Sequence, residues 1–431
     1  MFQPQEKPCR ARLAVCISAL AFACAIALAA SAQAAKDGAS PAEAAKAEAP
    51  AQDSTRVPQD SPKVKELEQS LAAIRLPPGF SISLYALVPG ARDIAVGPQG
   101  KAIFVGTRGN KVYAVVDHAR LGRADEVVEF APAIEMKMPH GVCFAKDGVL
   151  FLAEQNRVLS FADAESSYRN PAIAAKTIVA QGALIPKEDE SDNHSTRVCR
   201  VGPDGKLYIS LGQPYNVPPH EKLAEFSKWG IGGIIRMKQD GSGREIFASG
   251  IRNSVGMDFN PVDQILWFTD NQVDRMGDDI PPGELNRALK AGLNFGFPWY
   301  GGGHTRTEDY KNDTPPKDVV FPQVEMVAHA ADLGMTFYRG SQFPPQYRGG
   351  IFSAQHGSWN RTIPIGARVM FTSLKANGSA KKTEPFAEGW RQEDGSYSGR
   401  PVDVAELPDG SLLVSDDYNG ALYRIAYIPP K

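Results

Sequence analysis

One pattern of apolar and polar positions recurs along the chain: an apolar run, a tight turn, then a second apolar run. It reads IAVGPQGKAIFV from Ile94, VCFAKDGVLFLA from Val142, VCRVGPDGKLYISL from Val198, MDFNPVDQILWFTD from Met257 and VDVAELPDGSLLVSD from Val402. Each copy predicts a β-hairpin, because two strand-like runs flank residues that favour turns of the Asp-Gly type. Recurrence at roughly 50–60 residues is typical of propeller blades. The pattern therefore predicts an all-β chain folded as a β-propeller.

A less regular blade is predicted from the runs 335–338, 351–354 and 367–374, which brings the count to a six-bladed β-propeller. Propellers usually close by pairing the last strand with N-terminal sequence, so we expect 422–425 to lie near 80–87. The long spans 163–193 and 277–322 are expected to be insertions, and long ordered loops in compact domains are often functional.

The N-terminus has the features of a secretory signal peptide, predicted over residues 1–34. Arg10 and Arg12 supply the charge, residues 13–30 supply the apolar region, and Ala32-Gln33-Ala34 is a small-x-small cleavage site. An uncleaved anchor is disfavoured because the run is Ala-rich and weakly apolar. We expect a periplasmic or secreted protein without a stable membrane anchor after cleavage.

Three further segments follow the predicted signal. They are a disordered linker over 35–61, rich in Ala, Pro, Glu and Lys, a short amphipathic helix over 62–75, and the propeller domain over 76–431.

The charge balance and the cysteine content limit the classes of partner and covalent cofactor that we expect. The chain has 47 basic and 49 acidic residues, so nothing indicates a nucleic acid or an anionic membrane as a partner. Cys143 and Cys199 remain after cleavage, and no Cys-x-x-Cys-His motif for haem attachment is present. Matching strands of neighbouring blades do not usually bring Cβ atoms into disulfide range. Two buried thiols are therefore favoured, although an oxidising compartment is compatible with a bridge.

Polar segments precede the inner strand of several blades. They are Pro139-His140-Gly141, Asp192-Asn193-His194-Ser195, Gly250-Ile251-Arg252-Asn253, His329-Ala330-Ala331-Asp332 and Gly399-Arg400-Pro401. Taken singly, each is more often a loop residue that satisfies nearby backbone groups. Because the segments recur in register with the blades, we expect them to converge on one end of the central channel.

Among these residues, His194 is the strongest candidate for a general base, since a neutral imidazole can take a proton from a substrate hydroxyl. Arg252 and Asn253 offer a cation and an amide to an oxygen that gains charge. Arg361 and Arg400 provide two more forked cations that suit carboxylates.

The oxygen-rich turn at Asp270, Asn271 and Gln272 is a candidate site for a hard cation such as Ca²⁺. Its spacing is not that of an EF-hand, and a solvated acidic turn is an equally good interpretation. The chain shows no dinucleotide-binding Gly-x-Gly-x-x-Gly helix start and no Gly-x-Ser-x-Gly elbow, which argues against Rossmann dehydrogenases and α/β-hydrolases.

At these residues the chain resembles the soluble quinoprotein sugar dehydrogenases, the PQQ-dependent glucose, sorbosone and pyranose dehydrogenases, and most of all the sorbosone dehydrogenase-like proteins. The resemblance covers about 76–425. It is carried by Leu76-Pro-Pro-Gly-Phe80, by Asn193-His194 with Arg197 and Gly202-Pro-Asp-Gly-Lys-Leu-Tyr208, by Arg252-Asn253-Ser-Val-Gly256, and by Gly292-Leu-Asn294-Phe-Gly296-Phe-Pro298.

The resemblance implies a six-bladed propeller that carries PQQ and Ca²⁺ over its channel and oxidises a sugar or sugar aldehyde. It implies catalytic roles for His194 and Arg252, cofactor contacts from His140, Arg252, Asn253, Arg361 and Arg400, and metal contacts from Asp270, Asn271 and Gln272. It also implies a separate electron acceptor, a cytochrome or a quinone. The chain departs from the family where a Lys is expected, since His356 or Arg361 stands there, where Val402 replaces an Arg, and where Asn193 replaces an Asp.

Two other functions are compatible with a propeller. A metal-dependent lactonase would need a carboxylate-rich metal site at the channel, whereas the predicted mouth is rich in His and Arg. A non-catalytic binding propeller would leave several cations unpaired in the channel, which is energetically costly.

Overall fold

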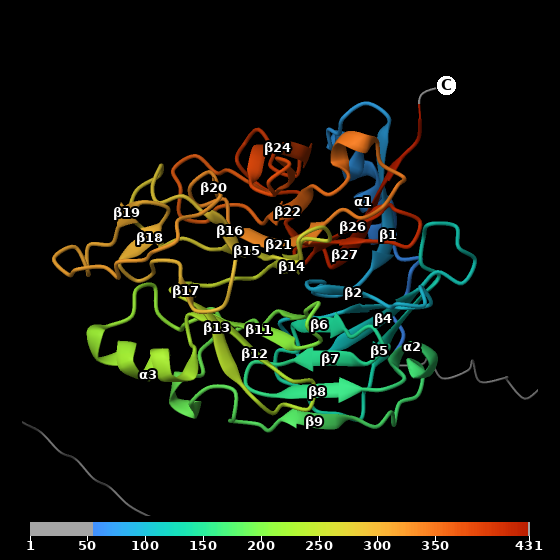
Figure 1. The fold of residues 1–431 in the computed structure, drawn as a ribbon. Helices are drawn as coiled ribbons and strands as arrows, with labels where there is room; N and C mark the ends of the chain where they lie inside the picture. Colours follow the sequence, from blue (N-terminus) through green and yellow to red (C-terminus); the bar gives the residue numbers. More distant parts are fainter. Residues whose placement is uncertain (1–54, 430–431) are drawn as a thin grey trace, which may run out of the picture. The chain divides into compact units, whose positions relative to one another are not determined.

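The computed structural model describes residues 55–429, which form six β-sheets arranged as the blades of a propeller (Figure 1). Blade 1 consists of β2 (Ile94–Val96), β3 (Ile103–Val105), β4 (Val112–Val116) and β5 (Glu126–Phe130), and blade 2 of β6 (Gly141–Phe144), β7 (Leu150–Ala153), β8 (Val158–Phe161) and β9 (Lys176–Val179). Blade 3 consists of β10 (Cys199–Val201), β11 (Leu207–Leu211), β12 (Gly233–Met237), β13 (Glu245–Ser249) and the short parallel strand β17 (Leu293–Asn294). Blade 4 consists of β14 (Met257–Phe259), β15 (Leu266–Asp270), β16 (Glu284–Ala288) and β20 (Val324–Glu325).

The last two blades complete the ring. Blade 5 consists of β21 (Asp332–Phe337), β22 (Ile351–Gln355), β23 (Arg368–Leu374) and β24 (Ala380–Glu388), and blade 6 of β25 (Pro401–Glu406), β26 (Leu412–Asp416), β27 (Ala421–Tyr427) and β1 (Phe80–Leu87). β1 pairs with β27 from Phe80 opposite Tyr427 to Leu87 opposite Ala421. The predicted six-bladed propeller and its closure by N-terminal sequence are both confirmed.

The innermost strands pack directly on one another around the axis. β2, β6, β10, β14, β21 and β25 contact one another in turn, and β25 contacts β2. Figure 1 shows β2, β6 and β14 near the middle of the sheets and β9 and β24 at the periphery. The approach is close enough to require glycine, because a Cβ on Gly256 would lie 2.3 Å from the Leu333 oxygen. Side chains that lead into these strands are therefore brought close together.

The described chain also contains short helices and 3₁₀ turns. They are α1 (Pro62–Ser70), α2 (Ala164–Ser167) and α3 (Leu223–Trp229), with 3₁₀ turns η1 (Leu71–Ala73), η2 (Lys187–Asp189), η3 (His220–Lys222) and η4 (Pro345–Tyr347). The helix predicted over 62–75 corresponds to α1 and η1, whose Val64, Leu67 and Leu71 pack into the core cluster shared by blades 5 and 6. Within residues 55–429, no helix has the length and apolar character needed to cross a membrane.

The end of the predicted linker belongs to the folded domain. Val57 donates to the Val127 oxygen (2.8 Å), and Glu129 donates to the Thr55 oxygen (2.8 Å), so this segment pairs with the edge of blade 1. The ordered chain thus begins before residue 62, where the sequence placed it. The predicted signal peptide (1–34) and the rest of the predicted linker lie outside the described residues.

Both predicted insertions also supply blade strands. The span 163–193 contains β9, the outer strand of blade 2, and 277–322 contains β16 of blade 4. The same second span carries a small two-stranded sheet, β18 (Tyr300–Gly302) with β19 (Thr305–Arg306). These spans are therefore extensions of the blades rather than additions outside them.

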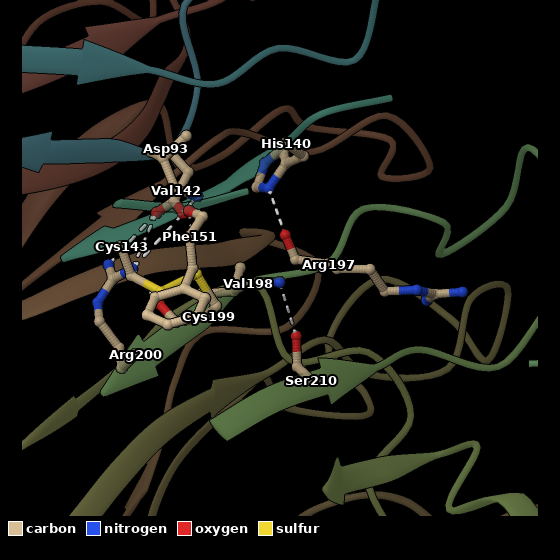
Figure 2. The surroundings of a disulfide bond; sticks show 10 residues. All are labelled: Asp93, His140, Val142, Cys143, Phe151, Arg197, Val198, Cys199, Arg200 and Ser210. Atoms are coloured by element: carbon tan, nitrogen blue, oxygen red, sulfur yellow. Dashed lines mark hydrogen bonds and ion pairs between the residues drawn. A yellow bond between two sulfur atoms is a disulfide. The ribbon is translucent and has the colours of Figure 1, made fainter. Parts of the chain in front are cut away.

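Cys143 and Cys199 form a disulfide, so the preference for two thiols was wrong (Figure 2). The cysteines lie in β6 and β10, the inner strands of blades 2 and 3, with their Cα atoms 5.7 Å apart. The sequence argument assumed a larger separation between matching strands. Near the axis, neighbouring inner strands converge, and that convergence brings the two Cβ atoms into range.

We expect the Cys143→Ala/Cys199→Ala double variant to have a free energy of unfolding about 4 kcal/mol lower than that of the oxidised protein. The reason is that the bridge closes a segment with a sequence separation of 56 residues. The measurement is denaturant unfolding of the oxidised protein and the variant, followed by tryptophan fluorescence. Equal midpoints would show that the ring of inner strands alone sets the stability of this region.

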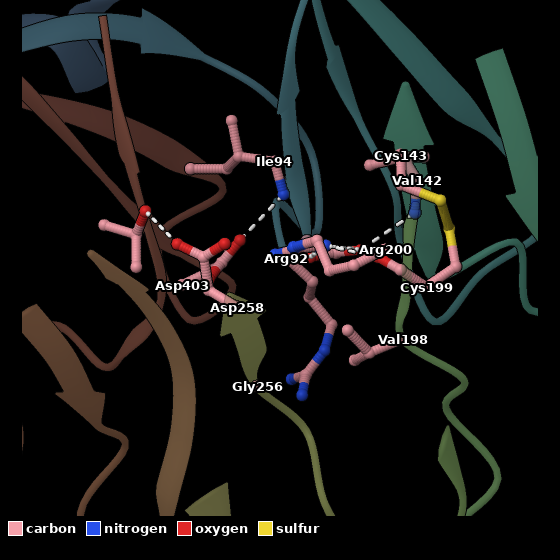
Figure 3. A network of polar contacts seen from close by, with 12 residues as sticks. Arg92, Ile94, Val142, Cys143, Val198, Cys199, Arg200, Gly256, Asp258 and Asp403 are labelled. Carbon is pink, nitrogen blue, oxygen red and sulfur yellow. Dashed lines mark hydrogen bonds and ion pairs between the residues drawn. A yellow bond between two sulfur atoms is a disulfide. The ribbon is translucent and has the colours of Figure 1, made fainter. Parts of the chain in front are cut away.

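Buried aspartates link further inner strands at the axis (Figure 3). Asp93 accepts a hydrogen bond from the Val142 nitrogen (2.8 Å), and Asp403 accepts one from the Ile94 nitrogen (2.9 Å). Arg200 reaches across from blade 3 to Asp93 at 3.3 Å. Burial raises the pKa of both carboxyls. The network thus connects blades 6, 1, 2 and 3 close to the inner strands.

Candidate active site

One end of the channel, which we call the upper mouth, is built from two sets of segments. The first set leads into the inner strands (92–93, 139–140, 194–197, 252–253, 329–332 and 399–400), and the second joins the second and third strands of each blade (106–111, 154–157, 212–232, 271–283, 356–367 and 417–420). All of the predicted site residues lie in these segments or, in the case of Asp270, at the strand end beside them.

Carboxylates at the ends of second strands fix the segments that lead into the inner strands. Asp270 ends β15 and accepts hydrogen bonds from the backbone nitrogens of Arg252 (2.9 Å) and Asn253 (2.7 Å). Asp416 ends β26 and accepts from the nitrogen of Arg400 (3.0 Å). Asp270, predicted as a metal ligand, therefore positions the Arg252-Asn253 pair by its two oxygens. Burial raises its pKa to about 6.

His194 is held as a neutral imidazole with one free lone pair. Its Nδ1 lies 2.6 Å from the Gln213 carbonyl oxygen. Because a carbonyl only accepts hydrogen bonds, Nδ1 carries the proton and Nε2 keeps its lone pair. Burial lowers the pKa of His194 to about 3, and the nearby charge of Arg252 adds to this effect. Its φ of 48° lies in the left-handed region, where backbone strain is typical of functional sites.

Arg197 holds this strained segment through hydrogen bonds to the backbone. Its guanidinium donates to three backbone carbonyls, those of Gln155 (3.0 Å), His194 (3.0 Å) and Gly212 (3.3 Å). The residue is only 2% exposed, and burial lowers its pKa to about 10. Within residues 55–429 it forms no ion pair with a carboxylate, and the nearby charge of Glu190 offsets only part of the effect of burial on its pKa.

Arg252 lies close to His194, and its guanidinium already binds other residues of the protein. Its side chain donates to the Asn216 carbonyl (2.9 Å) and side-chain oxygen (2.8 Å) and pairs with Asp274 at 2.9 Å. Asn253 keeps a buried Oδ1 without a protein partner. Gly212 brings the two segments together, since a Cβ there would lie 2.5 Å from Asn253 Oδ1 and 2.9 Å from the Cβ of His194. The structure thus joins His194, Arg252 and Asn253, as predicted from the sequence.

His140 contributes from blade 2. Its Nδ1 donates to the Arg197 carbonyl oxygen at 2.9 Å, as Figure 2 shows, so the protonated nitrogen is again fixed by a backbone group. Its Nε2 is buried and has no protein partner. Burial holds the pKa of His140 well below its usual value. His140 therefore adds a second neutral imidazole, linked to the His194 segment through Arg197.

A second polar group comes from blades 5, 6 and 1. His356 donates from Nε2 to Asp417 at 2.8 Å, and Arg92 pairs with the same carboxylate. Burial alone would raise the pKa of Asp417, but the His356 bond and the charge of Arg92 hold it below its usual value. Arg400 donates to the backbone oxygens of His356 (3.0 Å) and Gly357 (2.6 Å) and has no carboxylate partner in the described chain.

Arg361 lies in the upper-mouth segment 356–367, where its side chain contacts a neighbouring loop of the protein. Its guanidinium donates to the Asp278 and Ala328 carbonyls and pairs with Asp279 at 3.3 Å. His329 binds the same loop through the Gly277 (2.7 Å) and Ile280 (3.0 Å) carbonyls. The contacts of Arg361 therefore hold the loop of blade 4 beside the mouth, and a cofactor contact from it stays a prediction.

Two buried oxygens without partners lie beside the predicted metal turn. Gln272 Oε1 and Asp332 Oδ2 have no hydrogen-bond partner. Both face Gly283, where a Cβ would lie 3.3 Å and 2.0 Å from them. Burial raises the pKa of Asp332 to about 7. In the described chain no group of three or more His, Cys, Asp and Glu side chains is arranged around a metal position, so a cation here would rely on amide and backbone oxygens as well.

Comparison with known proteins gives this arrangement a context. The family model described as glucose/sorbosone dehydrogenase matches residues 156–424. The chain belongs to the glucose/sorbosone dehydrogenase family. It is 29% identical over 370 residues to an uncharacterised protein of Borreliella burgdorferi (84% of this chain, 92% of that protein). It is 25% identical over 264 residues to the aldose sugar dehydrogenase of Escherichia coli (56% of this chain, 62% of that protein).

Solved structures show the same fold. The holo form of the pyranose dehydrogenase PQQ domain of Coprinopsis cinerea superposes with a TM-score of 0.66 at 18% identity, covering 82% of this chain and 97% of that one. The apo form of the soluble aldose sugar dehydrogenase of Escherichia coli gives a TM-score of 0.54 at 17% identity, covering 81% and 99%.

Sequence reasoning assigned no site role to three arginines of this member of the glucose/sorbosone dehydrogenase family, although it named Arg197 in a motif that carries the resemblance. Arg92 and Arg197 flank inner strands, and Arg108 lies in the loop after the second strand of blade 1. Arg108 is exposed, donates to the Asp192 carbonyl oxygen (3.1 Å), and adds to the lowering of the pKa of both His140 and His194. Arg108 could have been found by examining the loops after second strands, which supply half of the upper mouth.

Proposed function

We propose that the protein is a PQQ- and Ca²⁺-dependent dehydrogenase of a sugar or sugar aldehyde, with His194 as the general base. The observation that carries this proposal is a cationic mouth that encloses a neutral base. Arg108, Arg197 and Arg400 have no carboxylate partner within the described residues. Arg197 is buried, Arg400 is partly buried and Arg108 is exposed. Because an unpaired cation is costly to bury, such a mouth suits an anionic ligand.

The donor set fits PQQ, which carries three carboxylates and an orthoquinone. Forked arginines match carboxylates geometrically. Arg92 Nε, His140 Nε2 and Asn253 Oδ1 are buried polar atoms without partners, from blades 1, 2 and 4. Gln272 Oε1 and Asp332 Oδ2, beside the Asp270–Gln272 turn, supply the oxygen ligands that Ca²⁺ prefers. Orphaned polar groups of this kind are uncommon in proteins, and a bound ligand would satisfy them.

In this proposal each residue of the site has a separate role in the reaction. Bound PQQ would accept the hydride, which is the chemistry that the protein alone lacks. His194 Nε2 accepts the proton of the substrate hydroxyl, while Gln213 fixes the ring through Nδ1. The charge of Arg252 stabilises negative charge that develops nearby. Arg400 and Arg108 hold carboxylates at the mouth.

The predicted signal peptide supports a periplasmic or secreted location, and a disulfide is typical of oxidising compartments. We further propose sorbosone-like aldehydes or aldoses as substrates and a separate cytochrome or quinone as the electron acceptor.

The test is to titrate PQQ and Ca²⁺ into the pure protein, follow the PQQ absorbance, and then measure dye reduction with aldoses and sorbosone. We expect a spectral shift on binding and dye reduction that needs both additions. No spectral change and no reduction with any substrate would contradict the proposal, and lactone hydrolysis without PQQ would favour the lactonase instead.

We expect Arg400→Gln to weaken PQQ binding roughly 10- to 100-fold, because hydrogen bonds to charged groups contribute about 1.5–3 kcal/mol. Absorbance titration measures the change. Arg75→Gln is the control, since Arg75 is exposed on the outer side of blade 5, where its ion-pair partner Glu388 ends β24. Equal affinities in the two variants would remove Arg400 from the cofactor site.

A further inference from the structure

The Gly292–Pro298 phrase has no place in the proposed chemistry, yet it forms one wall of a cavity. The cavity has a volume of about 340 Å³ and lies between this phrase, α3 and the end of β13. Figure 1 shows α3 beside β13, on the outer side of blade 3. Its lining includes Gly292, Asn294, Phe297 and Pro298 from the phrase. A volume of this size accepts a small organic ligand.

The walls combine aromatic faces with free hydrogen-bonding groups. Phe226, Phe297 and Trp299 line the cavity, and no charged side chain does. Ser227, Ser249 and Asn294 also line it, and within the described chain the two serine hydroxyls and the Asn294 amide nitrogen make no hydrogen bonds. An uncharged ring with apolar faces and peripheral hydroxyls would use both kinds of group.

We propose that this cavity, which the 212–232 segment of the upper mouth helps to line, is a second binding site, for an uncharged pyranose-sized sugar, and is distinct from the proposed PQQ site. Apolar ligands would leave the serine and asparagine groups unused. Charged sugars would bring an ionised group into a cavity without a counter-charge, which is costly. The neutral sugar ring is the class that matches the whole lining.

The cavity is close to the proposed base, and one residue connects them. Gln213 lines the cavity, and its carbonyl oxygen accepts the Nδ1 hydrogen bond of His194. Phe297 also lines a small space that includes Arg252 and Asp270. A sugar in the cavity therefore contacts residues that position the catalytic group, and we expect its binding to change kcat of the loaded enzyme.

Direct binding tests the site without relying on the proposed dehydrogenase activity. The probe is methyl α-D-glucopyranoside, whose anomeric oxygen is blocked, titrated calorimetrically into the full protein with and without PQQ. We expect saturable binding in both states, with a Kd in the millimolar range or tighter. Binding that requires PQQ, or that PQQ abolishes, would place the sugar at the proposed PQQ site and overturn the proposal.

Two neighbouring positions on α3 give a matched pair of variants. Ser227 lines the cavity, whereas Lys228 is also exposed on the same helix and does not line it. We expect Ser227→Trp to weaken sugar binding at least tenfold and Lys228→Trp to change it less than twofold. Trp299→Leu should weaken it too, through loss of an aromatic face. Equal binding by both tryptophan variants, or uptake of an apolar dye with no sugar binding by the wild-type protein, would overturn the site. Failure of the PQQ titration would leave it standing.

Discussion

Replacing His194 by alanine is expected to lower kcat by roughly 10²- to 10⁴-fold while PQQ binding is retained, because general bases contribute about this much. The imidazole is fixed by Gln213 at 2.6 Å and offers Nε2 as its only lone pair. Dye reduction measures turnover, and absorbance titration measures the cofactor. His118→Ala is the control, since His118 is exposed, pairs with Asp125 at 2.6 Å, and lies in the segment that joins the third and fourth strands of blade 1, outside the upper mouth.

The pH profile provides a second measurement of the same residue. Since burial and Arg252 lower the pKa of His194 to about 3, its imidazole stays neutral from about pH 4 upward. We therefore expect kcat/KM to show no loss from protonation of His194 between pH 5 and 7, the range in which an ordinary histidine titrates. The contrary result is a fall in kcat/KM of the wild-type protein below about pH 6.5 that is absent from the residual activity of the His194 variant. It would show that the base is more exposed to water than its burial indicates.

The propeller could be predicted from the sequence because its information is local. Each hairpin carries its own turn, and strands buried on both faces read as apolar runs. The blade that starts at β21 was harder to recognise, since its first two strands are joined by 13 residues that contain η4 rather than by a tight turn. The disulfide could not be predicted, because the separation of Cys143 and Cys199 depends on how closely six inner strands converge.

The candidate site was predictable only in part, for a similar reason. The sequence identifies His194, Arg252 and Arg400 as polar residues at recurring positions, and the structure places all three at the upper mouth. The sequence does not show which groups these side chains bind. Asp270 binds two backbone nitrogens, and Arg361 binds a loop of blade 4, because each contact involves a segment that only the tertiary fold brings near.

The convergence of the inner strands leads to the largest stability effect that we expect. Gly334 lies in β21 of blade 5, and a Cβ there would lie 1.9 Å from Asp403 Oδ1 and 2.6 Å from the Asp403 Cα of blade 6. The second contact is with backbone, so it cannot be relieved by rotating a side chain. Asp403 is also fixed by its bond to the Ile94 nitrogen at 2.9 Å. A single added methyl must therefore separate blades 5 and 6 at the axis.

We expect Gly334→Ala to lower the free energy of unfolding by about 3 kcal/mol or more, at the upper end of overpacking effects. Urea unfolding followed by tryptophan fluorescence measures the loss. Gly109→Ala is the matched control, because a Cβ at this exposed loop position meets only Thr107 Oγ1, at 3.5 Å. Equal unfolding midpoints for the two variants would mean that the inner strands can move apart at little cost. In that case the packing of the inner strands would not fix the positions of His194 and Arg400, which lie in segments that lead into two of these strands.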